Sequence, residues 1–155
     1  GYIPKTGMKI MSLADPSKKM SKSDSNPNAS VGILDGYDDI IRKFRRAVTD
    51  SDTVVRYADG KDGINNLMTI YSCFTGKSFE EIEKEFDGKG YGDFKSAVGE
   101  TVADSLKPLR EKFTALMKDK AYLEDIMRMG AENASRIAAR TVSKVHRKLG
   151  FAQLK

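Results

Sequence analysis

Cysteine and histidine are almost missing from this chain of 155 residues, which contains one of each, Cys73 and His146. A single cysteine excludes a disulfide framework and a cysteine-based zinc site. A single histidine excludes almost every histidine-based metal or catalytic arrangement. We therefore expect no protein-ligated metal, and the lone thiol fits the reducing cytoplasm.

Long apolar runs are missing as well. No stretch of about 18 apolar residues occurs, which excludes a transmembrane helix, and the start of the chain lacks the pattern of a signal peptide. The sequence thus predicts a cytoplasmic protein with no membrane partner. The first residue is Gly1 rather than Met, so we expect a piece of a longer protein.

The charge of the chain is unevenly distributed. The net charge is +5, yet residues 1–24 carry five lysines against two aspartates, and residues 131–155 carry six basic residues against one glutamate. Two terminal blocks of positive charge favour a polyanionic partner, such as nucleotide phosphate or RNA. A merely solvated basic surface is the alternative interpretation.

The order of the elements predicts a mainly α fold. Residues 7–13 alternate partly in polarity, which is typical of a short strand, residues 15–30 form a polar loop, and residues 31–34 are a candidate for a second extended piece. Helical periodicity then predicts segments at residues 37–48, 62–74, 78–86, 93–117, 122–129 and 131–149. A strand is not stable alone. We therefore expect residues 1–35 to be the tail of a sheet domain and residues 36–155 to be a helical bundle.

Local signals place the ends of these helices. Ser78 and Glu81 form a capping box, and Asp93 is a candidate cap for the helix that follows the glycines at 88–92. Pro108 is expected to kink that helix or divide it in two. In the last helix, apolar residues at helical spacing predict a buried stripe, formed by Ala134, Ile137, Ala138, Thr141, Val142, Val145 and Leu149.

The polar loop carries the residues that indicate chemistry. Lys19 and Lys22 place two ammonium groups three residues apart, and Ser21 and Ser23 add hydroxyl donors. This set suits a triphosphate, since two cations can meet the negative charge that develops on a departing pyrophosphate. A solvated basic loop or a basic address signal is the alternative for such a short motif.

Two groups of basic residues are candidates for RNA contact. On the last helix the residues recur at spacings of four, four and three, as Arg136, Arg140, Lys144 and Arg147. On the first helix Arg42, Lys43, Arg45 and Arg46 form a similar cluster, where the nearby acidic residues favour surface ion pairs instead. For the last helix, the spacing of the basic residues alone supports two interpretations equally: contact with RNA phosphates, or a solvated helix face.

The five residues from Lys19 to Ser23 are identical to the signature loop of the class I aminoacyl-tRNA synthetases. Residues 8–24 resemble the strand and signature loop of the bacterial tryptophanyl-tRNA synthetases, and residues 47–51, 63–67 and 88–92 resemble their C-terminal half. The resemblance covers essentially the whole chain. It implies a Rossmann-like catalytic domain ending within residues 1–35, followed by a helical anticodon-binding domain over residues 36–155.

The resemblance also implies the activity and the site. The family activates tryptophan with ATP, accompanied by Mg²⁺, and transfers it to tRNA, normally as a homodimer. By resemblance Lys19 and Lys22 are the catalytic residues that hold the phosphates, Ser21 and Ser23 assist them, and Met20 and the backbone of Ile10 line the adenine site. The basic stripe of the last helix would contact tRNA.

Two parts of the family pattern are absent from this sequence. The signature loop with two histidines is missing, since His146 is the only histidine, and so is the tryptophan pocket. The resemblance thus implies half of an ATP site and a fragment that is inactive alone. A fragment of a tyrosyl-tRNA synthetase and a non-catalytic helical RNA-binding module are the alternatives.

Overall fold

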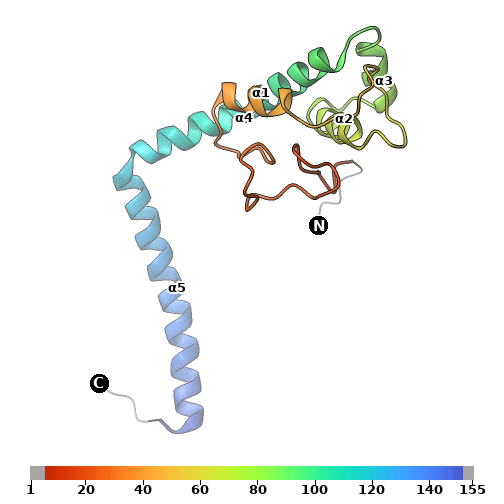
Figure 1. Cartoon of the computed structure of the whole chain (residues 1–155). Coiled ribbons are helices and arrows are strands. Elements are labelled where there is room, and N and C mark those ends of the chain that lie inside the picture. The colour runs from red at the N-terminus through yellow and green to blue at the C-terminus, as the bar shows by residue number, and fades with distance from the viewer. Residues whose placement is uncertain (1–5, 152–155) are drawn as a thin grey trace. The chain divides into compact units, whose positions relative to one another are not determined.

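The computed structural model describes residues 6–151, and within them the chain is mainly α-helical, as the sequence predicts (Figure 1). The helices are α1 (Tyr37–Arg45), α2 (Asp62–Thr75), α3 (Phe79–Glu85), α4 (Tyr91–Lys118) and α5 (Lys120–Leu149). The chain forms two compact units, one up to Arg110 and one from Glu111 onward. The boundary predicted between residues 35 and 36, where the catalytic domain would end and the helical domain begin, stays a prediction.

The first unit is built around one apolar core. Helices α1, α2, α3 and the first part of α4 contribute buried residues at helical spacing, including Ile40, Phe44, Ile64, Leu67, Met68, Ile82, Phe94, Val98 and Val102. Tyr71, Phe86 and Phe94 meet edge to face, with ring centroids 4.9–5.9 Å apart. At Gly63 an added Cβ would lie 2.9 Å from Thr49 Cα, so the start of α2 requires glycine to approach the chain after α1.

Several helix ends follow the sequence signals and others do not. The capping box of Ser78 and Glu81 is present at the start of α3, with both reciprocal hydrogen bonds formed. Helix α4 begins at Tyr91, so Asp93 lies in its first turn and is not its cap. Pro108 does not divide α4. The Arg110 guanidinium donates a hydrogen bond to the carbonyl of Ala103, seven residues earlier (3.1 Å), while the carbonyl that Pro108 leaves without its helical N–H partner is that of Asp104.

The last two predicted helices are one helix, α5, which passes through Gly130 without a break. Glycine in a helix interior costs only about 1 kcal/mol, and the left-handed conformation that ends a helix occurs at Gly150 instead, with φ of 72°. The expected burial of its apolar stripe is wrong for the described residues. No residue of α5 is buried, and Ile137 is 66% exposed.

The strand expected over residues 7–13 is reduced to a single antiparallel bridge between Met11 and Lys19. A strand needs neighbouring strands to be stable. Among the described residues this segment is bonded instead to the far arm of its own loop, to the Asn66 side chain and to the Val48 N–H, and these contacts give one isolated bridge rather than a strand. Residues 33–34 form a turn rather than an extended piece. Among the helices that the structure describes, none is both long and apolar enough to cross a membrane.

Candidate functional site

The loop with Lys19 and Lys22 is carried on a short hairpin. On one edge of the hairpin, the Met20 N–H donates to the carbonyl of Ile10 (3.0 Å) and the Ser12 N–H donates to the carbonyl of Lys18 (2.8 Å). These bonds bring Ile10 beside Met20, the two residues that the resemblance assigns to the adenine site. The hairpin thus fixes where the loop leaves the core of the first unit.

The other edge of the hairpin is held by a side chain. The Met11 N–H donates to Asn66 Oδ1 (2.8 Å), and Asn66 Nδ2 donates to the carbonyl of Met11 (2.9 Å). Asn66 lies on α2 and is 6% exposed. Its amide pairs with both peptide groups of one residue, as a neighbouring strand would. The first arm of the loop is therefore fastened to the buried helix α2.

The tip of the loop is shaped by bonds between near neighbours. The Ser23 N–H donates to Ser21 Oγ (3.2 Å), the Asn26 N–H to Asp24 Oδ1 (2.8 Å), and the Asn28 N–H to Asn26 Oδ1 (3.0 Å). Serine, aspartate and asparagine make such local turns without help from a core. The side chains from residue 21 to residue 27 are exposed, so the tip remains open to a ligand.

The three lysines of the loop are not equivalent. Lys18 forms an ion pair with Asp15 (2.8 Å). The hydrogen bond from Lys18, with those from Ser17, lowers the pKa of the Asp15 carboxyl to about 2. Within residues 6–151, neither Lys19 nor Lys22 has a carboxylate at ion-pair distance. The two lysines that the sequence singles out are thus the ones that keep their charge available.

Helix α1 fastens the far end of the loop. Lys43 Nζ donates to the carbonyl of Ser30 (2.8 Å) and to Asp35 Oδ2 (2.7 Å). Burial alone would raise the pKa of Asp35, but the bonds from Lys43 and from the Gly32 N–H outweigh it, and the pKa is lowered. Arg42 is paired with Asp39 (2.6 Å). At these two positions the basic cluster of α1 makes the ion pairs that the nearby acids favour.

An apolar groove of about 350 Å³ lies beside the hairpin. Ile10 and Met20 line it, together with Phe44, Ile70, Cys73, Val102 and others. Burial raises the pKa of the Cys73 thiol, which disfavours the thiolate that a nucleophile needs. The structure therefore brings Ile10 and Met20 to one surface, and the exposed Cys73 beside them does not have the lowered pKa of a reactive thiol.

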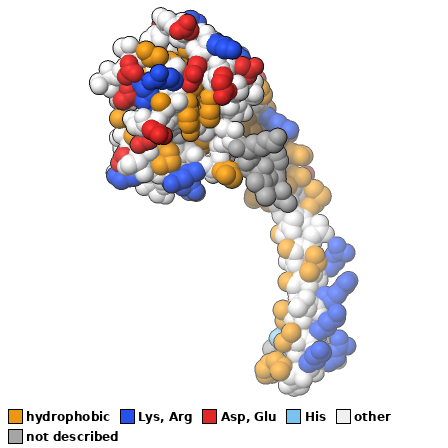
Figure 2. All heavy atoms as spheres, turned by 90° about the vertical axis from the view of Figure 1, so that its right-hand side faces the viewer, with side chains coloured by type: hydrophobic (Ala, Val, Ile, Leu, Met, Phe, Trp, Pro, Cys, Tyr) orange, Lys and Arg blue, Asp and Glu red, His pale blue; other side chains and the backbone are white. Residues whose placement is uncertain are grey.

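The basic stripe of α5 is present as expected from its spacing. Arg136, Arg140, Lys144 and Arg147 are exposed, and no acidic side chain of the described residues pairs with any of them. Figure 2 shows basic side chains along one side of this helix and apolar side chains along another. The helix therefore presents two chemically different faces.

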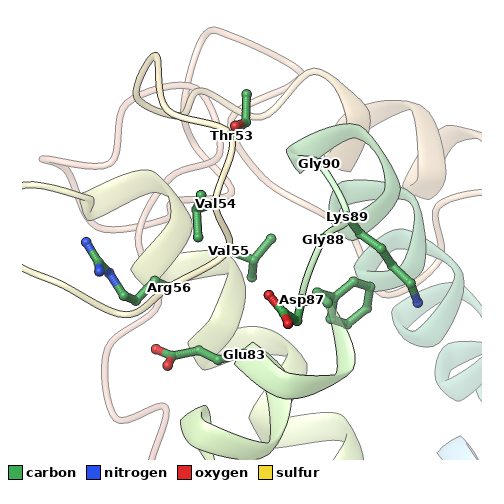
Figure 3. A pocket seen from close by; sticks show the side chains of 10 residues that line it. Thr53, Val54, Val55, Arg56, Glu83, Asp87, Gly88, Lys89 and Gly90 are labelled. Atoms are coloured by element: carbon green, nitrogen blue, oxygen red, sulfur yellow. The ribbon is translucent and has the colours of Figure 1, made fainter.

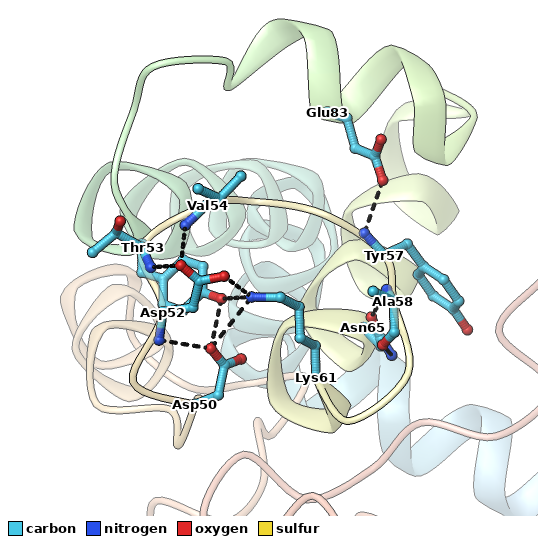
Figure 4. Close-up of polar contacts among 10 residues, drawn as sticks. Asp50, Asp52, Thr53, Val54, Tyr57, Ala58, Lys61, Asn65 and Glu83 are labelled. Atoms are coloured by element: carbon cyan, nitrogen blue, oxygen red, sulfur yellow. Dashed lines mark hydrogen bonds and ion pairs between the residues drawn. The ribbon is translucent and has the colours of Figure 1, made fainter.

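A buried polar cluster of the first unit was not expected from the sequence (Figure 4). Lys61 is 8% exposed, and its Nζ lies 2.6 Å from Asp52 Oδ2, 3.4 Å from Asp50 Oδ1 and 2.7 Å from Tyr91 Oη. The Tyr91 hydroxyl in turn donates to Asp50 Oδ1 (2.9 Å). These groups join the chain after α1 to the starts of α2 and α4. No local signal could reveal them, because they are 9 to 41 residues apart.

The charges of this cluster reinforce one another. Hydrogen bonds from Lys61 and from the N–H groups of Thr53 and Val54 lower the pKa of Asp52 to about 2. Bonds to Asp52 and Tyr91 raise the pKa of Lys61. At Asp50 burial favours the protonated form, yet bonds from the Asp52 N–H, Tyr91 and Lys61 leave the pKa lowered. Lys61, Asp50 and Asp52 are therefore charged at neutral pH, while the pKa of Tyr91 is raised by burial and its hydroxyl stays neutral.

Asn65 repeats the arrangement of its neighbour Asn66. The Ala58 N–H donates to Asn65 Oδ1 (3.1 Å), and Asn65 Nδ2 donates to the carbonyl of Ala58 (2.8 Å). Two adjacent asparagines of α2 thus hold two extended segments, one at Met11 and one at Ala58. The available sequence signal was the pair of adjacent asparagines on the largely buried helix α2.

Comparisons with known proteins agree on one family. The model of the family described as tRNA synthetases class I (W and Y) matches residues 3–107. The tryptophan–tRNA ligase of Clostridium acetobutylicum is 52% identical over 151 residues, which are 97% of this chain and 45% of that protein. The enzyme of the same name from Wolinella succinogenes is 49% identical over 149 residues, 96% of this chain and 45% of that protein.

Solved structures give the same result. The tryptophanyl-tRNA synthetase of Campylobacter jejuni, complexed with ADP and tryptophan, has a TM-score of 0.76 at 25% identity and covers 97% of this chain and 46% of its own. That of Mycoplasma pneumoniae has a TM-score of 0.70 at 26% identity, over 96% and 45% of the two chains. The chain thus spans about 45% of the length of the curated relatives that it matches.

Proposed function

Because this chain belongs to the class I tRNA synthetases of the tryptophan and tyrosine type, we propose that it is the C-terminal part of a tryptophan–tRNA ligase. Such an enzyme joins tryptophan to ATP, forming tryptophanyl-adenylate and pyrophosphate, and then transfers the tryptophanyl group to tRNA. Six relatives at 43–52% identity carry the name tryptophan–tRNA ligase, which favours tryptophan over tyrosine.

One observation carries the proposal: Lys19 and Lys22 are the loop lysines without an acidic partner among the described residues, while Lys18 is paired with Asp15. In the first step the carboxylate of tryptophan attacks the α-phosphorus of ATP, and the bond to the leaving pyrophosphate breaks. Negative charge grows on the pyrophosphate oxygens as this bond lengthens. Two ammonium groups on a loop that can adjust to the phosphates would stabilise that charge.

The remaining residues of the loop have supporting roles in this proposal. Ser21 and Ser23 add hydroxyl groups for the phosphates, and Met20 and the main chain of Ile10 face the adenine. Mg²⁺ arrives with ATP, and no covalent intermediate with the enzyme is involved. Positioning and charge stabilisation then supply the rate.

The tip of the loop lies between two fixed ends. Asn66 holds Met11 at one end, and Lys43 holds Ser30 at the other. Only the exposed residues between these ends need to move when ATP binds. This division suits a loop that must approach the phosphates and withdraw after pyrophosphate has left.

The tRNA partner is proposed from the basic stripe of α5. Arginine and lysine on one helix face suit phosphate oxygens, which fix the position of an RNA without reading its sequence. We further propose that the complete enzyme works in the cytoplasm as a homodimer, as is normal for the family.

The test is a chimera in which the preceding part of the Clostridium acetobutylicum relative is joined to this chain. We expect ATP–pyrophosphate exchange that depends on tryptophan and is absent with tyrosine, and no exchange from this chain alone. A folded chimera without tryptophan-dependent exchange, next to an active parent enzyme, would contradict the proposal.

A further inference from the structure

One basic residue of α1 differs from its neighbours. Arg42 is paired with Asp39, and Arg45 Nε donates to Ser96 Oγ on α4 (3.1 Å), and both arginines are exposed. The Lys43 side chain, in contrast, is 12% exposed. An ammonium group withdrawn from water to this extent requires bonded acceptors close by, and the acceptors of Lys43 lie at the end of the signature loop.

The first acceptor is the main chain of the loop. Lys43 Nζ lies 2.8 Å from the carbonyl oxygen of Ser30. The residue before it, Ala29, is fully buried, and its carbonyl accepts the Leu13 N–H (3.0 Å). Two consecutive carbonyl groups at this end of the loop are therefore fixed, one by the segment that precedes the loop and one by α1.

The second acceptor keeps Lys43 in place. Asp35 Oδ2 lies 2.7 Å from Lys43 Nζ and also accepts the Gly32 N–H (2.9 Å). The Asp35 N–H in turn donates to the Gly32 carbonyl (3.0 Å), and a Cβ added at Gly32 would lie 2.7 Å from Asp35 Oδ1 and displace the carboxylate. The carboxylate thus directs the ammonium group toward Ser30 and neutralises it, so Lys43 does not act as a third cation for the phosphates.

The two lysines of the candidate site are related differently to this end of the loop. Lys19 lies in the hairpin, in the bridge with Met11, where main-chain bonds on either side fix its position. Lys22 lies in the exposed tip, which leaves the hairpin after Met20 and meets the rest of the unit again at residues 28–30. The position of Lys22 therefore depends on both ends of the tip, whereas that of Lys19 depends on the hairpin alone.

We propose that Lys43 is a positioning residue for Lys22: by holding Ser30, with Asp35 as its counter-ion, it sets where the tip can carry Lys22 toward the phosphates of ATP. If Ser30 is released, the tip gains conformations in which Lys22 is out of reach, and the entropy of ordering them offsets part of the energy of the phosphate contact. Lys43 acts through the main chain and does not touch the substrate. This inference rests on the proposed function for its reaction.

The test is a double-mutant cycle in the chimera, followed by single-turnover formation of tryptophanyl-adenylate. Lys43→Met keeps the length of the side chain and removes its charge and its donors. We expect about tenfold slower adenylate formation, with tryptophan affinity within about twofold. The same change should cost about twofold or less in a Lys22→Ala background, where the contact is already lost, and still about tenfold in a Lys19→Ala background.

An equal loss in the two backgrounds would overturn the proposal, because Lys43 would then support the hairpin or the whole unit rather than Lys22. A loss of tryptophan affinity as large as the loss of rate would overturn it as well.

Lys89→Met is the matched control. Lys89 is an exposed lysine of the same unit, on the wall that the turn after α3 forms at a cleft of about 590 Å³ (Figure 3). The residues that line this cleft belong neither to the signature loop nor to α1, so the rate of adenylate formation should stay unchanged. A tenfold loss in this variant too would contradict a specific role for Lys43.

Hydrogen exchange in this chain provides a second measurement if Lys43→Met destabilises the chimera. The amides of Leu13 and Ala29, which are bonded at the far end of the loop, should lose protection, while those of Ser12 and Met20 in the hairpin keep it. The double variant Asp35→Asn/Lys43→Met, which leaves no unpaired charge, should give the same pattern. Loss of protection spread equally over the hairpin and α2 in both variants would overturn the proposal.

The outcome is separable from that of the proposed function. An active chimera with equal losses in the two backgrounds would reject the role of Lys43 and leave the ligase. An inactive chimera would reject the ligase, and with it the phosphate contact that Lys43 is proposed to support.

Discussion

Removing the amide of Asn66 should loosen the signature loop without unfolding the protein. In Asn66→Ala, the N–H and the carbonyl of Met11 both lose the partner that lies 2.8–2.9 Å away. Each bond contributes about 1 kcal/mol net, so local opening of the hairpin should become easier by about 2 kcal/mol. This corresponds to roughly 30-fold faster amide exchange at Met11 when exchange follows local opening.

Hydrogen exchange followed by NMR measures this effect at single amides. The amides of Ser12 and Met20, which donate within the same hairpin, should lose protection together with that of Met11. Asn65→Ala is the matched control, because it makes the same change one residue away and frees Ala58 instead. It should leave the hairpin protected and expose the Ala58 amide.

A uniform loss would refute this reasoning. If Asn66→Ala lowers the protection of core amides in α2 and α4 as much as that of Met11, the residue supports the whole unit rather than the loop. The same conclusion follows if Asn65→Ala and Asn66→Ala give indistinguishable patterns.

Three further predictions concern the cluster, the tip of the loop and the last helix. The pKa of Asp52 in the folded protein is about 2, below its ordinary value of 3.8. The ionised carboxylate therefore contributes its full stabilisation above about pH 4, and this contribution is lost as the pH falls through 2. The urea midpoint of Asp52→Asn should accordingly fall less between about pH 4 and pH 2 than that of the original chain. The amides of Ser21 and Lys22 should exchange faster than those of α2, and equal protection would count against an open tip. Replacing Arg140 and Lys144 by alanine should reduce the salt slope of tRNA binding by about 2, and an unchanged slope would place the contact elsewhere.

The helices of the first unit could be predicted because their signals are local. Apolar residues at helical spacing gave α2 within one residue at its end, and the capping box gave the start of α3. The signature loop was recognisable for the same reason, since five consecutive residues define it. Their positions along the chain could be found without knowledge of distant residues.

Features that depend on distant residues could not be predicted. Lys61 is buried among acidic residues that precede it by 9 and 11 positions and a tyrosine that follows it by 30, so the sequence alone suggests an ordinary surface lysine. Asn66 acts on a residue 55 positions earlier. The prediction of a strand before the loop was wrong for a related reason, because a strand forms only where neighbouring strands are available.

The apolar stripe of α5 shows a different limit. The spacing of its apolar residues predicts a helix face that prefers burial, and the structure does place these residues on a helix. An amphipathic pattern does not say which surface covers it, and no residue of α5 is buried within the part of the chain that the structure describes. The pattern therefore predicted the helical conformation of residues 131–149 correctly, but not their continuity with the preceding helix or their exposure.

The role of Lys19 and Lys22 can be measured by single-turnover formation of tryptophanyl-adenylate in the chimera. Lys19→Ala and Lys22→Ala should each slow this step about a hundredfold, equivalent to about 3 kcal/mol, while tryptophan affinity stays within a few-fold. Lys18→Ala is the control, since Lys18 is occupied by Asp15, and its rate should stay near normal. Near-normal rates in the Lys19 and Lys22 variants with a loss of tryptophan affinity, or an equal defect in Lys18→Ala, would contradict the phosphate role of the loop.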